Sequence, residues 1–398
     1  MIGAAGDSSA GRLADRDIVC VGFAEWDAPL WTNQQHLMSR LAASNRVLFI
    51  ESLGLRRPQI AGADLSRMAR RLARGLRGPR DRDGVAVLSP LVIPLHSSAA
   101  VRALNARLLP ALVRRAVRRL GMSRPVLWAY VPQAEVLLEP LDPALVVYHC
   151  VDDIASQKGV DATSFRAAED RFARRADLVI ASSRPLARRM RELNDNVLEA
   201  PNVADTALFA TALGPGETDP AMAALPEPRI AFTGAVTATK LDLGLIEEIA
   251  RARPAWSLAL VGPVGAGDPS TDVSALEAIE NVHLLGPRSY GDLPSVLRGA
   301  AAGLIPYALN DLTTGIFPMK VYEYLAAGLP VISTPLPSLE GVEDVTVAAG
   351  AEEAVAALDR AIATDDRASR ERRSLAAAAH SWDERIAEIG VALGAIGR

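Results

Sequence analysis

A lysine and a glutamate three residues apart stand on a short segment whose two ends are marked for a helix. Pro318 suits the first helical position, Gly328 suits the left-handed residue after the last turn, and Pro330 prevents the helix from continuing. Lys320 then falls in the first turn, where the helix dipole disfavours a cation by about 0.3–1 kcal/mol unless an anion is bound there too. Because helix N-termini bind phosphates through free N–H groups, this pattern predicts a phosphate site.

Glu323 lies on the same helix face as Lys320, about one turn deeper. A carboxylate at that depth could accept hydrogen bonds from both hydroxyls of a ribose. The alternative is an ordinary surface salt bridge between the two side chains, which their spacing alone does not exclude.

The segment 24–36 follows an apolar run and concentrates aromatic and polar side chains. Trp26, Trp31 and His36 are candidates for binding an acceptor sugar, because sugar rings stack on aromatic faces and hydrogen-bond to polar groups. The alternative is that both tryptophans pack under the loop while the polar groups cap the next helix.

A histidine and two aspartates end another apolar run. His149, Asp152 and Asp153 are candidates for catalysis or for acceptor binding, and the alternative for the histidine is a buried core residue. Tyr130 and Gln133, at the end of the preceding run, are further acceptor-binding candidates.

Parallel β-sheets are expected to position these residues. Short runs rich in Val, Ile and Leu alternate with segments of helical period, which predicts βα units. The runs of the first series cover residues 18–23, 47–51, 85–88, 126–130, 145–150 and 178–181. Those of the second series cover residues 229–233, 257–261, 282–285, 303–306, 331–334 and 345–348. The fold class is therefore α/β, with each series forming a doubly wound, Rossmann-like domain that binds ligands at the carboxyl ends of its strands.

The chain is expected to divide into two domains with short additions. These parts are a flexible N-terminus at 1–16, an acceptor-side domain at 17–205, a Gly- and Pro-containing linker at 206–228, a donor-side domain at 229–380 and a C-terminal helix at 381–398 that crosses back to the first domain.

Composition indicates a soluble cytoplasmic protein. Of the 398 residues, 49% are hydrophobic, no apolar stretch approaches the ~18 residues of a spanning helix, and the N-terminal segment lacks the apolar centre of a signal peptide. Cys20 and Cys150 stand in apolar runs, so buried thiols are expected rather than a disulfide.

The two halves differ in charge. Residues 1–200 carry 29 Lys+Arg against 21 Asp+Glu, whereas the remainder carries 14 against 26. The segment from Arg56 to Arg82 holds nine arginines and two acids, with leucines along one helical face, a pattern typical of contact with an anionic membrane surface. A solvated helix that packs its leucines on the core is the alternative, and nucleic acid is not expected because this stretch lacks aromatics.

The motif Pro-x-Lys-x-x-Glu-Tyr-Leu-Ala-Ala-Gly-x-Pro-Val resembles the nucleotide-binding helix of GT-B glycosyltransferases in the family-four-like group, glycosyl transferases group 1. The resemblance implies two Rossmann-like domains facing across a cleft, with Glu323 on the donor ribose. Members of this group carry a second glutamate eight residues earlier, where this chain has Gly315, so Thr313 and Thr314 are candidates for contacting the donor's sugar or phosphate instead.

Two more loops resemble the same group in order and spacing. The segment 233–242 resembles the loop after the first strand of the donor domain, which implies that Gly234 approaches the donor and that Lys240 meets its diphosphate. The segment 286–290 matches the loop that frames the base, which assigns Arg288 and Tyr290 to base contacts. The residues around His149 resemble the strand end that faces the donor.

The resulting prediction is a glycosyltransferase that moves a sugar from a nucleotide diphosphate donor to a glycan or lipid-linked acceptor, in the cytoplasm or at the inner face of the membrane. No metal or other cofactor is implied, because lysines and the helix terminus would stabilise the leaving diphosphate. A nucleotide-sugar epimerase of GT-B fold and a non-catalytic glycan-binding or scaffold protein are the alternatives.

Overall fold

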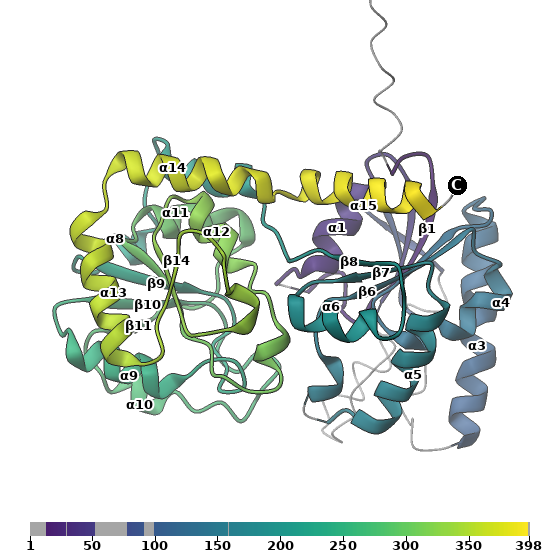
Figure 1. The fold of residues 1–398 in the computed structure, drawn as a ribbon, viewed down its shortest axis with the longest axis horizontal. Coiled ribbons are helices and arrows are strands. Elements are labelled where there is room, and N and C mark those ends of the chain that lie inside the picture. Colours follow the sequence, from purple (N-terminus) through teal and green to yellow (C-terminus); the bar gives the residue numbers. More distant parts are fainter. Residues whose placement is uncertain (1–12, 29, 52–77, 91–98, 158, 397–398) are drawn as a thin grey trace, which may run out of the picture. The chain divides into compact units, whose positions relative to one another are not determined.

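The computed structural model describes residues 13–28, 30–51, 78–90, 99–157 and 159–396, which form two compact units. The first unit comprises the residues up to Pro201 together with those from Arg385 onward, and the second comprises Asn202–Glu384. Figure 1 shows a sheet flanked by helices in each of them.

The sheet of the first unit has eight strands in the order β3-β4-β2-β1-β5-β6-β7-β8, and only β3 runs antiparallel to its neighbour. Its strands are β1 (Asp17–Val21), β2 (Arg46–Ile50), β3 (Arg80–Arg82), β4 (Val85–Leu88), β5 (Val126–Ala129), β6 (Leu145–Cys150), β7 (Leu178–Ala181) and β8 (Val197–Glu199). The pairing of Val21 with Ala129, and of Ala129 with Tyr148, aligns the carboxyl ends of the central strands. Residues that follow these strands therefore lie along one edge.

Helices cover both faces of this sheet. Their bounds, with the 3₁₀ segments marked η, are α1 (Asn33–Leu41), α3 (Ala99–Arg119), η2 (Pro132–Leu137), α4 (Leu138–Leu141), η3 (Ile154–Ser156), α5 (Ala162–Arg175), α6 (Arg184–Arg191) and α15 (Trp382–Ile396). Apolar side chains of α3, α5 and α6 pack on alternate strand residues to form one buried cluster. Helix α1 begins where the sequence signals it, because Thr32 and Gln35 form a capping box.

The sheet of the second unit has six parallel strands in the order β11-β10-β9-β12-β13-β14. They are β9 (Arg229–Thr233), β10 (Ser257–Val261), β11 (Val282–Leu284), β12 (Ala302–Ile305), β13 (Val331–Ser333) and β14 (Val345–Val347). All six strands predicted for this half of the chain are present. The runs that are buried on both faces are the central strands β9, β10, β12 and β13, whereas β11 and β14 form the edges of the sheet.

The helical elements of the second unit are α7 (Thr206–Ala210), η4 (Thr211–Leu213), α8 (Pro220–Ala223), α9 (Leu243–Ala252), α10 (Ser274–Glu277), η5 (Tyr290–Asp292), α11 (Leu293–Arg298), η6 (Thr313–Gly315), α12 (Lys320–Ala326), η7 (Pro337–Leu339), α13 (Ala351–Thr364), α14 (Arg367–Ala377) and η8 (Ala378–His380). Figure 1 shows α11, α12 and α14 on one side of the sheet and α9 and α10 on the other.

The segment 206–228 is not the linker that its glycines and prolines predicted. It forms α7, η4 and α8 on the second unit, where Phe209 and Met222 are fully buried. Asp219 caps α8 through the backbone N–H groups of Ala221 and Met222. Apolar side chains in an otherwise broken sequence thus attach the segment to the core of the second unit.

Within the described residues, no helix is both long and apolar enough to cross a bilayer. Both cysteines are buried free thiols, as expected.

Candidate functional site

The ammonium group of Lys320 lies over the loop that follows β9. Gly234 is the first residue of that loop and has a φ of +128°. A Cβ at Gly234 would stand 2.7 Å from Lys320 Nζ, so only glycine leaves room for the lysine. Lys320 Nζ also lies 5.3 Å from the ring centroid of Phe232. The structure thus brings together two residues that the sequence assigned separately to the donor diphosphate.

Glu323 is buried one turn further along α12, with 6% of its surface exposed. Burial raises the pKa of its carboxyl group, and the charge of Lys320 and the nearby phenol of Tyr290 partly offset that rise. Tyr290 begins η5 and packs edge-on against Phe209, with 5.3 Å between ring centroids. Two separate segments, α12 and η5, therefore place a cation, a carboxylate and a phenol in one neighbourhood of the second unit.

Tyr324 fixes the position of α12 on the sheet. Its hydroxyl accepts a hydrogen bond of 2.7 Å from the backbone N–H of Thr233, the last residue of β9. Its ring occupies the space beside Gly303 in β12, where a Cβ would lie 2.3 Å from Cδ2 of the ring. At the far end of the helix Gly328 has a φ of +79°, which confirms the predicted left-handed stop. The position of Lys320 and Glu323 consequently depends on a fully buried tyrosine.

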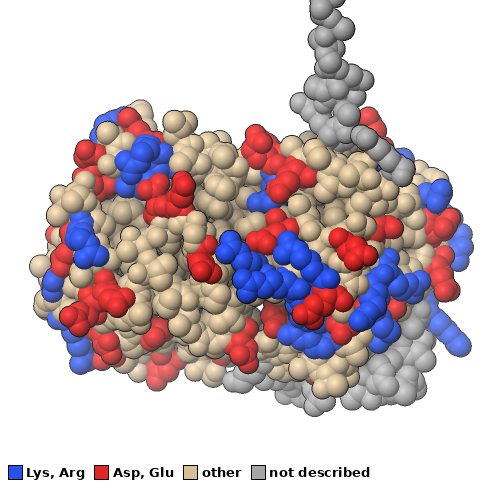
Figure 2. Space-filling view, in the orientation of Figure 1, with Lys and Arg blue, Asp and Glu red and all other residues tan. Residues whose placement is uncertain are grey.

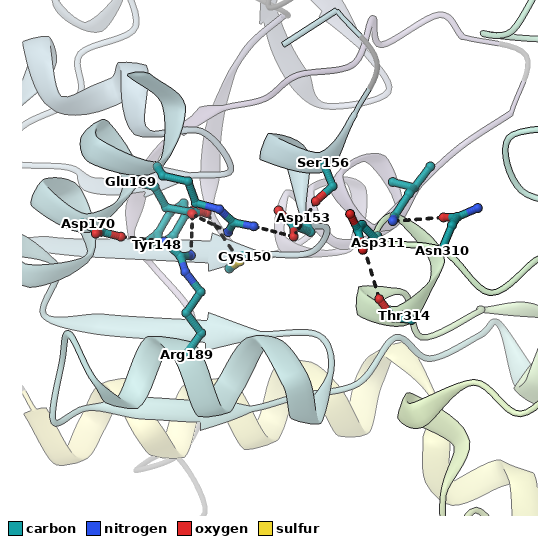
Figure 3. Close-up of polar contacts among 12 residues, drawn as sticks. Tyr148, Cys150, Asp153, Ser156, Glu169, Asp170, Arg189, Asn310, Asp311 and Thr314 are labelled. Carbon is teal, nitrogen blue, oxygen red and sulfur yellow. Dashed lines mark hydrogen bonds and ion pairs between the residues drawn. The ribbon is translucent and has the colours of Figure 1, made fainter. Parts of the chain in front are cut away.

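Polar groups in the loop after β12 are used within the loop itself. The side-chain oxygen of Asn310 accepts from the N–H groups of Leu312 and Thr313, each at 3.0 Å, and Thr314 donates its hydroxyl to the carbonyl of Asp311 at 3.3 Å (Figure 3). The hydroxyl of Thr313 donates to the carbonyl of Ala308, and Thr313 is fully buried. Thr313 is therefore a structural residue of the loop, contrary to its predicted contact with the donor.

Gly315 is buried at the end of η6, so the position of the missing glutamate is inside the loop. Thr314 is half-buried. Lys240 is exposed, and its carbonyl accepts from the N–H of Ala308 at 2.9 Å. This bond ties the loop after β9 to the loop after β12 and leaves the ammonium of Lys240 on the surface of the second unit.

Arg288 does not lie free to contact a base. Its guanidinium binds both carboxylate oxygens of Asp219, at 2.7 and 3.2 Å, and donates to the carbonyl of Leu285 at 2.8 Å. This hydrogen-bonded pair lowers the pKa of Asp219. The structure thus gives Arg288 the role of fixing α8, which the sequence could not indicate because the pair is 69 residues apart.

In the first unit, His149 lies in a stack of buried aromatic rings. The indole N–H of Trp128 donates to His149 Nδ1 at 3.4 Å, and the ring of Tyr130 stacks on the imidazole at 4.8 Å. Because an indole can only donate, Nδ1 is the unprotonated nitrogen and Nε2 carries the proton. His149 Nε2 has no hydrogen-bond partner among the residues that the structure describes.

Burial, together with the positive charge of Arg385, lowers the pKa of His149 to about 3. The neutral imidazole is therefore suited to donate a hydrogen bond through Nε2 rather than to act as a base. Tyr130 is fully buried and donates its hydroxyl to the side-chain oxygen of Asn33 at 2.9 Å, so its predicted contact with an acceptor does not fit the structure. Gln133 is half-buried on η2, and its side-chain oxygen has no partner in the described part of the chain.

Asp153 follows β6 and is held by two side chains. One of its carboxylate oxygens accepts from the hydroxyl of Ser156 at 2.9 Å (Figure 3). The same oxygen accepts from the guanidinium of Arg166. The other oxygen is buried without a partner among the described residues. Asp152 is half-buried beside it.

Arg166 in turn contacts Glu169, a carboxylate with 2% of its side chain exposed. Glu169 also accepts from the hydroxyl of Tyr148 and from Arg189, each at 2.5 Å (Figure 3). The two arginines and the hydroxyl offset the cost of removing the Glu169 carboxylate from water. The sequence analysis missed this network, since arginines and acids in α5 and α6 look like solvated helix faces.

The loop after β1 is mostly packed inward. Trp26 is buried against Phe49 and donates its backbone N–H to Glu51 at 2.8 Å, so the alternative of packing under the loop is correct for this residue. His36 is buried as well, and burial lowers its pKa to about 3. Trp31 is 36% exposed. Of the three acceptor candidates in this loop, only Trp31 offers a ring to a ligand.

No group of His, Cys, Asp and Glu side chains suited to a metal ion occurs among the described residues.

Two doubly wound sheets of parallel strands, one in each unit, define the GT-B fold that the sequence predicted. Residues 227–364 match the family model of glycosyl transferases group 1, which agrees with the resemblance of the donor-side segment. Over 109 residues the chain is 34% identical to TuaH of Bacillus subtilis (strain 168), a candidate teichuronic acid biosynthesis glycosyltransferase. The matched part is 27% of this chain and 27% of TuaH.

Solved structures of other proteins share the fold. The crystal structure of HepE from Anabaena in complex with UDP and glucose has a TM-score of 0.66 and 15% identity, and the match covers 95% of this chain and 99% of HepE. Sucrose-phosphate synthase from Thermosynechococcus elongatus also has a TM-score of 0.66 and 15% identity, with 94% and 97% of the two chains covered.

Proposed function

We propose that the chain transfers a sugar from a nucleoside diphosphate sugar to a glycan or lipid-linked acceptor. The observation that carries the proposal is the placement of Lys320 against Gly234, with the buried carboxylate of Glu323 one turn along the same helix. A diphosphate is a ligand of suitable charge for the lysine, and a ribose presents two hydroxyls to the carboxylate. Lys320 and Glu323 together form what we call the nucleotide clamp.

A uridine nucleotide is the proposed donor carrier. HepE, which shares the fold, was crystallised with UDP and with UDP-glucose. The family match of residues 227–364 covers both residues of the nucleotide clamp and the loop after β9. Tyr290 remains our candidate for a contact near the base, because its phenol lies close enough to Glu323 to influence the pKa of that carboxyl group.

Stabilisation of the leaving nucleoside diphosphate would be the main catalytic contribution. Charge develops on the diphosphate as the bond to the sugar breaks, and Lys320 and Lys240 would supply the compensating positive charge without a metal ion. Two of the three lysines of the sequence are thus assigned to one function. His149 would donate a hydrogen bond through Nε2, and the partnerless oxygen of Asp153 would accept one from a ligand hydroxyl.

A glycan acceptor is supported by the name of TuaH, which refers to teichuronic acid biosynthesis. Cytoplasmic location and peripheral contact with an anionic membrane belong to the same proposal. Residues 56–77 of the arginine-rich segment that suggested this contact lie outside the described residues. Arg80 and Arg82, at its end, are paired with acids, so these two arginines do not carry the contact.

Thermal unfolding in the presence of UDP, GDP, dTDP and ADP tests the proposal. A ligand at 100 times its Kd adds about 2.7 kcal/mol of stability, so UDP is expected to raise the melting temperature of the wild type more than the other nucleotides do. Lys320→Ala and Glu323→Gln are expected to lose most of this response. Glu247→Gln, which changes a surface glutamate paired with Arg251, is the control and should keep it. A full UDP response in both clamp variants would overturn the site, and no response of the wild type to any nucleotide would overturn the function.

A further inference from the structure

Helix α3 presents a row of arginines to solvent. The exposed arginines of its described side chains are Arg107, Arg114, Arg115, Arg118 and Arg119, and the helix contains no acidic residue. Arg107, Arg114 and Arg118 recur at intervals of seven and four residues, which places them along one stripe of the helix. Figure 2 shows Lys and Arg in blue along the right-hand edge of the molecule, where α3 lies in Figure 1.

Within the described part of the chain, these arginines have no acidic partner, whereas most arginines of the neighbouring helices have one. Arg171 and Arg175 of α5 pair with Glu135, and Arg184 and Arg191 of α6 pair with Glu199. In contrast, none of the exposed arginines of α3 forms an ion pair with any residue that the structure describes. No ion pair with a described residue therefore compensates the positive charge of α3, whereas most arginines of α5 and α6 are paired with acids.

The opposite side of α3 is anchored in the core, so the arginine stripe has a fixed orientation. Leu109, Val113 and Ala116 are buried against the sheet. Leu108 is 37% exposed next to the stripe, and Ala111 is exposed within it. Apolar and cationic groups on one exposed face suit the boundary between lipid headgroups and acyl chains. The exposed face offers no aromatic ring for base stacking, which disfavours nucleic acid.

We propose that the arginine face of α3 docks the protein on a bilayer surface that carries anionic lipid headgroups. Charge complementarity carries the proposal, since several unpaired arginines on one rigid helix face attract a surface of negative charge. The proposal deepens the proposed function by giving the lipid-linked acceptor a surface on which the enzyme meets it. It does not depend on the nucleotide clamp, because docking requires neither donor nor turnover.

Sedimentation of the full-length protein with vesicles tests the proposal. Vesicles of phosphatidylcholine alone are compared with vesicles that also contain phosphatidylglycerol, at low and at physiological salt. The wild type is expected to bind only the anionic vesicles, and more weakly as salt increases. Arg114→Gln with Arg118→Gln should weaken this binding roughly 25-fold, at about fivefold for each arginine removed.

A second double variant separates the α3 surface from overall charge. Arg184→Gln with Arg191→Gln removes the same charge from the same unit, but at arginines that are paired with Glu199. Its affinity for anionic vesicles should stay within a few-fold of the wild-type affinity. Equal weakening in both double variants would show that total charge, not this face, drives binding, and would overturn the proposal.

Two other results also contradict the proposal. The first is the absence of wild-type binding to anionic vesicles at low salt. The second is binding of a DNA duplex that the α3 variant abolishes while vesicle binding remains unchanged. Retained thermal response to UDP in the α3 variant would show that the protein is folded and that the nucleotide clamp is intact. Failure of the docking proposal and failure of the proposed function are thus separate outcomes.

Discussion

Replacing Gly234 by alanine tests whether Lys320 lies where the donor diphosphate is expected. The added Cβ would stand 2.7 Å from Lys320 Nζ and 2.8 Å from its Cε. These distances are well below van der Waals contact, so the flexible lysine side chain must leave the loop. We therefore expect Gly234→Ala to act on nucleotide binding through Lys320.

The expected magnitude has two parts. The φ of +128° at Gly234 is unfavourable for alanine, which costs about 1–2 kcal/mol of stability. Displacement of the lysine removes a charge-assisted hydrogen bond worth about 1.5–3 kcal/mol in binding. The Kd for UDP should therefore rise by roughly 10- to 150-fold, because each 1.4 kcal/mol corresponds to a factor of ten.

Isothermal titration calorimetry of UDP measures this change, and Gly341→Ala is the matched control. Gly341 lies in the same unit with a φ of +78°, and a Cβ there would have no atom within 4 Å. It should lose similar stability and keep wild-type affinity for UDP. In a Lys320→Ala background, Gly234→Ala should add little, because the two changes act through one group.

Two results would refute this reasoning. One is wild-type affinity for UDP in a folded Gly234→Ala protein. The other is full additivity of Gly234→Ala and Lys320→Ala in the double variant, which would mean that the new methyl group acts without the lysine.

Three further predictions concern buried groups. Burial raises the pKa of Glu323 above its ordinary value of 4.5, so the stability linked to its proton is complete below that value and is lost as pH rises through the folded pKa. Glu323→Gln should then melt higher than the wild type at pH 7 but not at pH 4, and equal differences at both pH values would contradict this. The pKa of His149 is lowered to about 3, so ¹⁵N spectra should show no titration of its ring between pH 5 and 8. The same spectra should show the proton on Nε2. A proton on Nδ1 would contradict the prediction. Gly303→Ala would place a Cβ 2.3 Å from Cδ2 of Tyr324. This overpacking should reduce the free energy of unfolding by about 1–3 kcal/mol and so lower the denaturation midpoint. An unchanged midpoint would show that Tyr324 does not fix α12.

The strands could be predicted because each is a short apolar run, and most of them are buried on both faces. All six runs of each series became strands, within two residues at their ends. The short strands β3 and β8 escaped prediction, since Arg80–Arg82 and Val197–Glu199 do not form apolar runs. Gly328 correctly marked the end of α12, whereas the helix begins at Lys320, two residues after the Pro318 that was expected to start it.

Contacts between residues distant in sequence could not be predicted. Arg288 looked available for a base until the fold placed Asp219 beside it. Tyr130 likewise offered its hydroxyl to a ligand in sequence, whereas the structure engages it with Asn33, 97 residues away. Such pairings depend on which helix covers which strand, and a polar residue type does not reveal whether its partner is a ligand or another part of the chain.

The linker was wrongly predicted for the same reason, because its packing depends on residues distant in sequence. Gly and Pro content correctly indicated broken secondary structure between the two sheets, but it did not show that the segment packs on the second core. Burial of Phe209 and Met222 decides that point. Turn residues thus report local geometry, whereas attachment to a domain depends on a few apolar side chains.

A crystal structure of the complex with UDP tests the nucleotide clamp most directly. The account predicts density for the diphosphate beside Lys320 Nζ at the loop after β9, with the ribose hydroxyls donating to the carboxylate of Glu323. UDP bound elsewhere in the protein, or bound here with its ribose away from Glu323, would contradict the central claim.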